Sequence, residues 1–305
     1  MKRLQIFGLF FLLSIKIFGQ IDMSDSTAQV IGYWNKNDKQ TYIVTQQDFK
    51  IKDSDTTSGE SYKYFVDISI VDSTADSYII NWLYRDYEIL SENPLLEKLL
   101  SISENLNVTI RTNEIGEFQE VMNWEDIRDY ILKGIEIVKN EIKDMPEFVN
   151  YINQMAGMFS TKESVESAAI KEMHQFYTFH GGRYEYGEEY IAEMKAANLY
   201  GGEPFDTKMT VWLDELNPDD NNFIVRMTQT IDSKQLTKAV YDYLVKMSET
   251  LNVAAPESKD MPLVTNEIRI ASRIHGSGWI IYSVETREVN AEGQTNIEER
   301  IIEIQ

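Results

Sequence analysis

The chain has 305 residues, of which 43% are hydrophobic and 11% aromatic, enough for the core of one large domain or two small ones. Acidic residues outnumber basic ones, 50 against 29, and the formal net charge is −21. Such a surface repels phosphate backbones and anionic lipid faces, which argues against nucleic-acid binding. The excess of acidic residues is best interpreted as a surface that keeps the protein soluble. The alternative interpretation is an acidic face that binds cations or a basic partner.

Residues 1–19 have the pattern of a secretory signal peptide: a basic start, a mostly apolar run and a small residue at Gly19. The run is short for a membrane span and Lys16 interrupts it, so an uncleaved anchor is the lesser alternative. Cleavage after Gly19 would remove three basic residues and leave 26 against 50 acidic ones, a net charge of −24. We therefore expect a soluble protein, exported to the periplasm or the cell exterior, with no membrane span after cleavage.

Cysteine is absent from the sequence. An exported protein of this composition has no disulfides and no thiol for a lipoprotein anchor. Its stability must come from burial, which favours a single domain over residues 20–305.

Hydrophobic alternation predicts several strands in the first part of the chain. Residues 21–32 lack a pattern and are expected to trail before the domain begins, and residues 53–60 are expected to form a loop. Asn93 and Pro94 have the order of an N-cap and first residue of a short helix. Strands are predicted at 41–51, 64–70, 78–87 and 108–112, with the second and third paired as an antiparallel hairpin.

The stretch from Gly116 to Ile127 leads from a strand into the best-defined helix. Asn123 is placed to cap the first turn, and Glu125 and Asp126 follow at the positive end of the helix dipole. An apolar stripe at helical spacing predicts that this helix packs against a sheet. The stripe consists of Trp124, Ile127, Ile131, Ile135, Val138 and Ile142.

Helical patterns continue to Tyr177, so residues 124–177 are predicted to form a helical block. Pro146 ends or kinks the first helix, and the run from Ser160 to Glu163 has the order of a capping box. Residues 180–205 are rich in Gly, Tyr and Glu, which favours irregular structure with an extended piece near 184–191.

The last third repeats the order of hairpin, helix and further strands. A turn cluster spans Asn217 to Asn221, and Asp232 is the predicted cap of a helix whose apolar stripe runs from Leu236 to Leu251. Strands are predicted at 208–213, 223–231, 268–274, 279–287 and 297–304.

These elements predict an α+β fold, in which a curved antiparallel sheet carries helices packed on one face. The sheet is expected to approach a half-barrel, and the two halves of the chain to form a loose pseudo-repeat. A curved sheet with helices can enclose an apolar groove, although the same side chains can simply fill a core.

Four short motifs follow one another along the chain: Trp34 to Asp38, Asn93 to Leu96, Gly116 with Phe118 and Asn123 to Ile127, and Tyr200 to Phe205. Together they resemble a family of uncharacterised exported proteins of Bacteroidota-type bacteria. The resemblance spans nearly the whole mature chain and implies no catalytic residues. Where the family pattern has glycine after Lys36, this chain has Asn37, which also adopts left-handed turn conformations.

Residues suited to nucleophilic or histidine chemistry are sparse. His174 and His180 lie six residues apart, a poor spacing for one metal, and His275 falls in a predicted hairpin turn. His174 is therefore expected at a polar helix position and His180 in a cap or loop. The run from Gly276 to Gly278 lacks the spacing of a nucleophile elbow.

Carboxylates are abundant, and two groups of them are considered as candidate sites. Glu185, Glu188 and Glu189 alternate with Tyr184, Tyr186 and Tyr190, as in a glycosidase-type site or, more simply, a half-exposed strand. Asp214, Asp219 and Asp220 offer oxygen ligands for calcium but lack the calcium-loop pattern. We accordingly predict no catalytic, cofactor-binding or metal residues.

The function predicted from sequence is non-catalytic. An exported protein without a catalytic constellation is expected to bind a hydrophobic small molecule or an envelope protein. The alternative is a carboxylate-based hydrolase that acts on glycans or peptides. A structural or interaction module is the third hypothesis.

Overall fold

The computed structural model describes residues 20–52, 55–89, 97, 100, 102–141, 156–157, 159, 161–168, 170–198, 200, 202–251 and 254–305. The long strands are β3 (Lys39–Lys52), β4 (Asp55–Ser73), β5 (Ser77–Ile89), β6 (Asn107–Asn113), β7 (Phe118–Val121), β9 (Glu189–Ala196), β10 (Phe205–Asn217), β11 (Asn222–Ile231), β12 (Thr265–His275), β13 (Ile280–Ala291) and β14 (Gln294–Ile304). The helices described are α2 (Trp124–Glu141), α4 (Lys162–Ala168), α5 (Lys171–Tyr177), α6 (Ser233–Leu251) and the 3₁₀ turn η1 (Ser258–Asp260).

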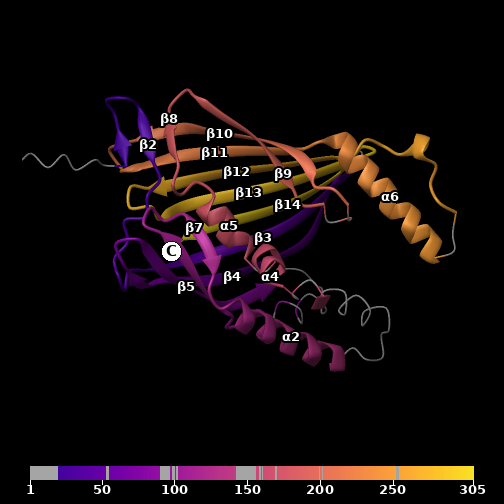
Figure 1. Ribbon diagram of the computed structural model, residues 1–305, viewed down its shortest axis with the longest axis horizontal. Coiled ribbons are helices and arrows are strands. Elements are labelled where there is room, and N and C mark those ends of the chain that lie inside the picture. Colours follow the sequence, from indigo (N-terminus) through magenta and orange to yellow (C-terminus); the bar gives the residue numbers. More distant parts are fainter. Residues whose placement is uncertain are drawn as a thin grey trace, which may run out of the picture.

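Within these residues the long strands form one antiparallel sheet of eleven strands. Its order is β7-β6-β5-β4-β3-β14-β13-β12-β11-β10-β9, so β7 and β9 are the edges. Each half of the chain meanders, and the C-terminal strand β14 joins the halves by pairing with β3 on one side and β13 on the other. Figure 1 shows the sheet running through the molecule, with α4 and α5 in front of it and α2 below.

The predicted α+β class is wrong, because antiparallel sheet dominates the structure. Among the described residues, strands account for 53% and helices for 21%. The hydrophobic cores of the strands were placed correctly, but their polar ends were not. The expected loop at 53–60 is mostly strand, since Asp55 to Ser58 pair with Phe49 to Lys52. The sheet is open, because its order ends at two different strands.

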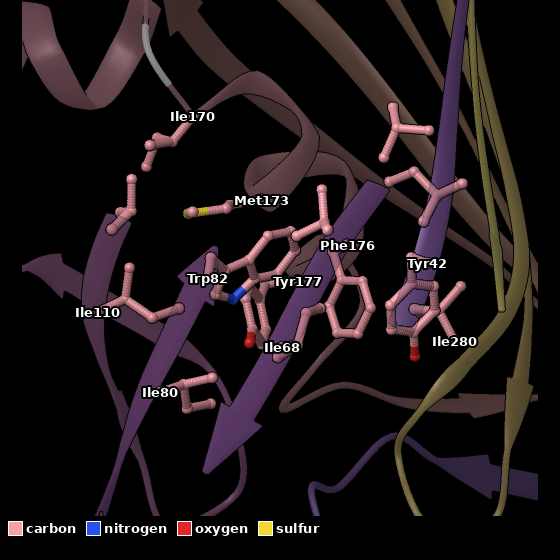
Figure 2. Packing of buried hydrophobic residues seen from close by; sticks show 14 of the residues in the cluster. Tyr42, Ile68, Ile80, Trp82, Ile110, Ile170, Met173, Phe176, Tyr177 and Ile280 are labelled. Atoms are coloured by element: carbon pink, nitrogen blue, oxygen red, sulfur yellow. The ribbon is translucent and has the colours of Figure 1, made fainter. Parts of the chain in front are cut away.

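Helix α5 lies against the face of the sheet that we call the inner face, and it seals the core there. Phe176 packs edge-on against Tyr42 of β3 and Trp82 of β5, with ring centroids 5.4 and 5.3 Å apart. Tyr177 and Met173 are buried beside them. Figure 2 shows these rings gathered between the helix and the strands. The core therefore sits under α5 (Figure 2) and extends along β4, β5 and β6.

Helix α2 buries the stripe that its sequence predicts. Ile127, Ile131, Ile135 and Val138 are all buried, and Ile142 lies outside the described residues. Trp124 is half-buried against the core, with the Arg128 guanidinium 5.1 Å from its ring centroid.

Asn123 does not cap this helix as expected. Its Oδ1 accepts from the Thr109 amide and its Nδ2 donates to the Asn107 carbonyl, so the side chain ties the turn to β6. The other caps are closer to prediction. Asp232 accepts from the Gln235 amide at 2.8 Å, and the capping box lies one residue later than expected, between Thr161 and Ser164.

Helix α6 extends beyond the sheet, at the right of Figure 1. Only the start of its predicted stripe is buried: Leu236 packs with Phe205 and Val264. Farther along, Tyr243 and Met247 are exposed. The predicted stripe is therefore buried at its start and exposed at Tyr243 and Met247.

The segment 21–32 was expected to trail, but it is docked. Strands β1 (Ile21–Asp22) and β2 (Thr27–Gln29) pair with each other, and β2 pairs with β8 (Arg183–Glu185) to form a small three-stranded sheet. The Val30 amide donates to the Gly182 carbonyl, and the side chain of Val30 is buried.

Among the described residues, no helix is both long and apolar enough to cross a membrane.

Candidate ligand-binding site

A pocket of about 390 Å³ lies between the inner face of the sheet and the helices α2 and α5. Its volume falls in the range of small-molecule sites. The sheet and the start of α5 provide one wall, and α2 with the segments around residues 100–106 and 159 provides the other. The two walls differ in chemistry.

The wall opposite the sheet is mainly apolar, although Ser103 also lines it. Ile131 and Ile135 reach it from α2, because these positions lie on the buried stripe of that helix. Ile102 and Leu106 join them from the segment before β6, and Phe159 completes the wall. A hydrocarbon group placed here would leave water for a surface of aliphatic and aromatic carbon.

The sheet wall is polar and carries a cluster of tyrosines. Tyr62 and Tyr64 of β4 and Tyr84 and Tyr87 of β5 all line the pocket. The rings of Tyr64 and Tyr87 are stacked with centroids 4.7 Å apart. Burial raises the pKa of Tyr62 to about 12 and that of Tyr64 well above its ordinary value, so these side chains are neutral phenols near pH 7.

Arg300 of β14 supplies a buried cation at the base of this wall. Its side chain is 8% exposed, and Nη1 lies 3.5 Å from Oε1 of Glu285. Its Nε donates to Oε1 of Gln46 at 3.3 Å, and its Nη1 donates to Oε1 of Gln175 at 3.4 Å. Burial disfavours the charged guanidinium, but attraction from Glu285 and Glu172 outweighs it and raises the pKa of Arg300.

Glu172 places a carboxylate on the same side of the pocket. It sits in the first turn of α5, is buried, and accepts a hydrogen bond from the hydroxyl of Tyr84. That contact joins α5 to β5. The pocket thus has a polar base in which one guanidinium, one carboxylate and several phenols meet.

Carboxylates also surround the polar part of the pocket, where Asp48, Glu60 and Glu298 are found. Asp48 and Glu298 face each other across the β3–β14 pairing. Burial, followed by the charge of Glu298, raises the pKa of Asp48. Lys171 at the start of α5 is the neighbouring cation.

The acidic group expected from sequence forms no such pocket. Glu185 ends β8, Glu188 lies in the following turn and Glu189 begins β9, and all three are exposed. Tyr184 is half-buried against Phe179, as the simpler reading of a half-exposed strand expects.

The three histidines are apart from the pocket. His174 is exposed on α5, and His275 closes the β12–β13 turn through Ser277. His180 follows α5 and is buried, with Nε2 2.9 Å from the Gly278 carbonyl oxygen and its ring stacked on Phe176. Burial lowers the pKa of His180 to about 4, so the ring is neutral near pH 7.

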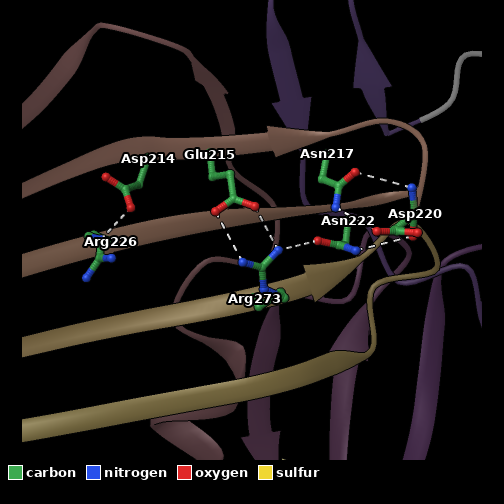
Figure 3. A network of polar contacts seen from close by, with 7 residues as sticks. All are labelled: Asp214, Glu215, Asn217, Asp220, Asn222, Arg226 and Arg273. Carbon is green, nitrogen blue, oxygen red and sulfur yellow. Dashed lines mark hydrogen bonds and ion pairs between the residues drawn. The ribbon is translucent and has the colours of Figure 1, made fainter.

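Two of the three aspartates considered for calcium, Asp214 and Asp220, are engaged elsewhere. Asp214 forms an ion pair with Arg226 at 2.7 Å, whereas Asp220 accepts from the side chain of Asn217 at 2.9 Å. Figure 3 shows these contacts at separate places along the β10–β11 hairpin, with Arg273 and Glu215 between them. Among the described residues, no group of three or more His, Cys, Asp or Glu is arranged to hold a metal.

Sequence reasoning named Ile131 and Ile135 only as part of a buried helix stripe, and it passed over Arg300 and the other charged pocket residues because most of them are polar positions within hydrophobic strands. One signal was present: in β14, Glu298 and Arg300 share a face with the buried Ile302, by simple alternation. The partners of Arg300 on β3 and α5 lie 254 and 125 residues away in sequence, and no local pattern joins them.

No family model matches the chain, and no curated protein matches it. Among solved structures it is similar to lipovitellin, in a structure that concerns lipid–protein interactions, with a TM-score of 0.40 and 10% identity. That match covers 89% of this chain and 25% of the lipovitellin chain. A second match is DynF from the dynemicin biosynthesis pathway of Micromonospora chersina, with a TM-score of 0.22, 6% identity, and 91% and 84% coverage. Likeness at this level assigns neither a fold family nor an activity to this chain.

Proposed function

We propose that this protein binds a small amphiphilic molecule, without transforming it, in the pocket between the sheet and helices α2 and α5. The observation that supports the proposal is the contrast between the two walls. An alkyl or ring portion would lie against Ile131 and Ile135, and a polar portion would face the tyrosines and Arg300. A purely apolar molecule would displace water from this polar wall without offering hydrogen bonds in return, which costs free energy.

A ligand of this kind can be detected on the purified protein. We expect native mass spectrometry of the gently purified chain to show a mass above that of the polypeptide, and organic extraction to release an amphiphile. The neutral fluorophore N-phenyl-1-naphthylamine should bind in the same pocket, and long-chain alcohols should displace it.

A matched pair of variants distinguishes binding in the pocket from binding to the exposed surface. Ile131→Trp adds bulk to the apolar wall and should weaken fluorophore binding at least about tenfold, a loss of roughly 1.4 kcal/mol. Ile137→Trp places the same ring on the exposed side of α2 and should leave binding unchanged. Equal affinity of both variants and the parent, with circular dichroism confirming the folds, would remove the proposal.

Carboxylate-based hydrolysis is the second candidate, and one observation supports it. Asp48 and Glu298 face each other across two strands beside the pocket, and the pKa of Asp48 is raised, as is common for a carboxyl group that donates a proton. A screen with chromogenic glycosides and peptides, repeated with Asp48→Asn, tests it. Activity that survives the substitution, or no activity in the parent, counts against this candidate.

Export remains part of the proposal. The basic start and apolar run before Gly19 support it. Expression in a Gram-negative host should yield a mature protein that begins at Gln20 and leaves the cytoplasm. Recovery of an intact N-terminus from the cytoplasm would show that the segment is not a functional signal.

A further inference from the structure

Strand β9 is a bare edge of the large sheet. It pairs with β10 on one side, and in the described part of the chain no strand pairs with its other side. Tyr190, Ile191 and Met194 are 41%, 59% and 44% exposed. Unpaired backbone groups on such an edge are a template for another strand. The opposite edge, β7, is short and has α4 packed beside it.

The symmetry of a two-chain sheet restricts how this edge can meet a second copy. Two identical strands that pair antiparallel are related by a two-fold axis perpendicular to the sheet. Residues that face each other then point to the same side, so their alternation must match. The axis must therefore pass beside one residue of β9, which then faces its own copy, and each choice of that residue gives a fixed set of facing pairs.

One choice brings together the opposite charges of the strand and its tyrosine and methionine, while Ile191 faces Glu193 of the second copy. With Ala192 on the axis, Glu189 faces Lys195 of the second copy, and Tyr190 faces Met194 of the second copy, each pair occurring twice. Opposite charges and aromatic–thioether contacts both favour such an arrangement. Lys195 lies beside Asp206 of its own chain, so its ammonium would be shared between two carboxylates.

Neighbouring choices are poorer. An axis at Ile191 sets Glu189 against Glu193, and an axis at Glu193 sets two glutamates directly opposite each other. Like charges in facing positions destabilise a sheet. An axis at Met194 pairs Glu193 with Lys195 but leaves only the end of the strand in register.

We infer that β9 is a homodimer interface, in which two copies join edge to edge with Ala192 on the two-fold axis and form one continuous sheet. The ligand pocket lies at β3, β4, β5 and β14, away from this edge in the strand order, so dimerisation is independent of the proposed ligand binding.

The absence of cysteine allows a direct test of this register. In Ala192→Cys the two new thiols would face each other, at a separation suited to a disulfide. Mild oxidation should convert most of this variant into a covalent dimer. Tyr282→Cys, an exposed position on β13 inside the sheet, serves as control and should stay monomeric. Ala192→Cys that crosslinks no more than this control overturns the register.

Charge reversal tests the facing pairs by sedimentation velocity. Lys195→Glu or Glu189→Lys alone should weaken dimerisation about tenfold or more, because two attractive pairs become repulsive. The double variant Glu189→Lys/Lys195→Glu should recover most of the loss. Lys63→Glu disrupts a comparable exposed pair with Glu88 inside the sheet and should leave dimerisation unchanged. A parent that is monomeric at 100-fold above the concentration used for crosslinking contradicts the inference.

Discussion

At the scale of single residues, Arg300 is a buried cation at the polar wall of the pocket. It is nearly buried, and two carboxylates and two amides surround it. Charged groups at such a depth are tolerated only when they are paired. Arg300 therefore stabilises Glu172 and Glu285 as much as they stabilise it.

Arg300→Met should lower the free energy of unfolding by about 3 kcal/mol, because it leaves Glu285 and Glu172 without their cation. Urea denaturation measures the change. Arg269→Met removes an exposed guanidinium that pairs with Glu288, and it should cost less than about 1 kcal/mol. A similarly small loss of unfolding free energy in both variants would show that Arg300 does not stabilise the buried carboxylates Glu285 and Glu172.

His180 gives the stability a defined pH dependence. Its pKa is near 4 in the folded protein and about 6.5 when unfolded. Between these values the unfolded chain binds a proton that the folded chain does not, so stability is complete above pH 6.5 and falls as the pH drops toward 4. The loss should reach about 3 kcal/mol.

The comparison with His180→Gln isolates this contribution from the carboxylates. The stability difference between parent and variant should shrink as the pH falls from 7 to 4.5, since the variant has no imidazole to protonate. Parallel pH profiles for the two proteins would refute a buried neutral imidazole.

Local sequence could predict some residue conformations and not others. Asn37 was expected to adopt a left-handed conformation, and it has φ of 75°. Asn123 was expected to cap α2, but its amide group binds the backbone of β6 instead. The first depends on the residue alone, whereas the second depends on a strand brought beside it by the fold.

At the scale of elements, α2 is the helix whose apolar periodicity and packing agree. Ile135 is 2% exposed and Ile137, two residues on, is 55% exposed. Ile135→Ala should cost about 3 kcal/mol through lost burial and a residual cavity. Ile137→Ala should change stability by less than about 0.5 kcal/mol. Thermal or urea unfolding of the pair checks which face of the helix meets the sheet, and equal costs would contradict the assignment.

The strand predictions failed mainly at strand ends. Alternation of apolar residues marks only the part of a strand that lies over the core, and β4 continues well beyond it through polar residues. Helix α6 shows the opposite difference. Its apolar residues recur at helical spacing, but the core does not extend to Tyr243 and Met247, which are exposed. Periodicity reports what can be buried, and the tertiary fold decides how much is.

At the scale of the molecule, the strand order was beyond prediction from local pattern. The pairing of β14 with β3 brings the two ends of the domain together and makes both of them central strands. Gln46 meets Arg300 only because of that pairing, and the polar wall of the pocket depends on it.

Hydrogen exchange should reveal this arrangement as a gradient. Amides of β3 and β14, which are paired on both sides like the other inner strands, should exchange slowly, and those of the edge strand β7 should exchange faster. Mass spectrometry of peptic peptides measures the rates. Fast exchange in β14 would indicate that the C-terminal strand does not join the two halves.

The location of a bound amphiphile tests the central claim most directly. A long-chain alcohol that carries a diazirine in its alkyl chain can be irradiated on the protein, and the labelled peptides mapped. The two-walled pocket predicts labels at Ile102 to Leu106 and on α2 around Ile131 and Ile135. Labels confined to the exposed residues of α6, or to no defined site, would contradict it.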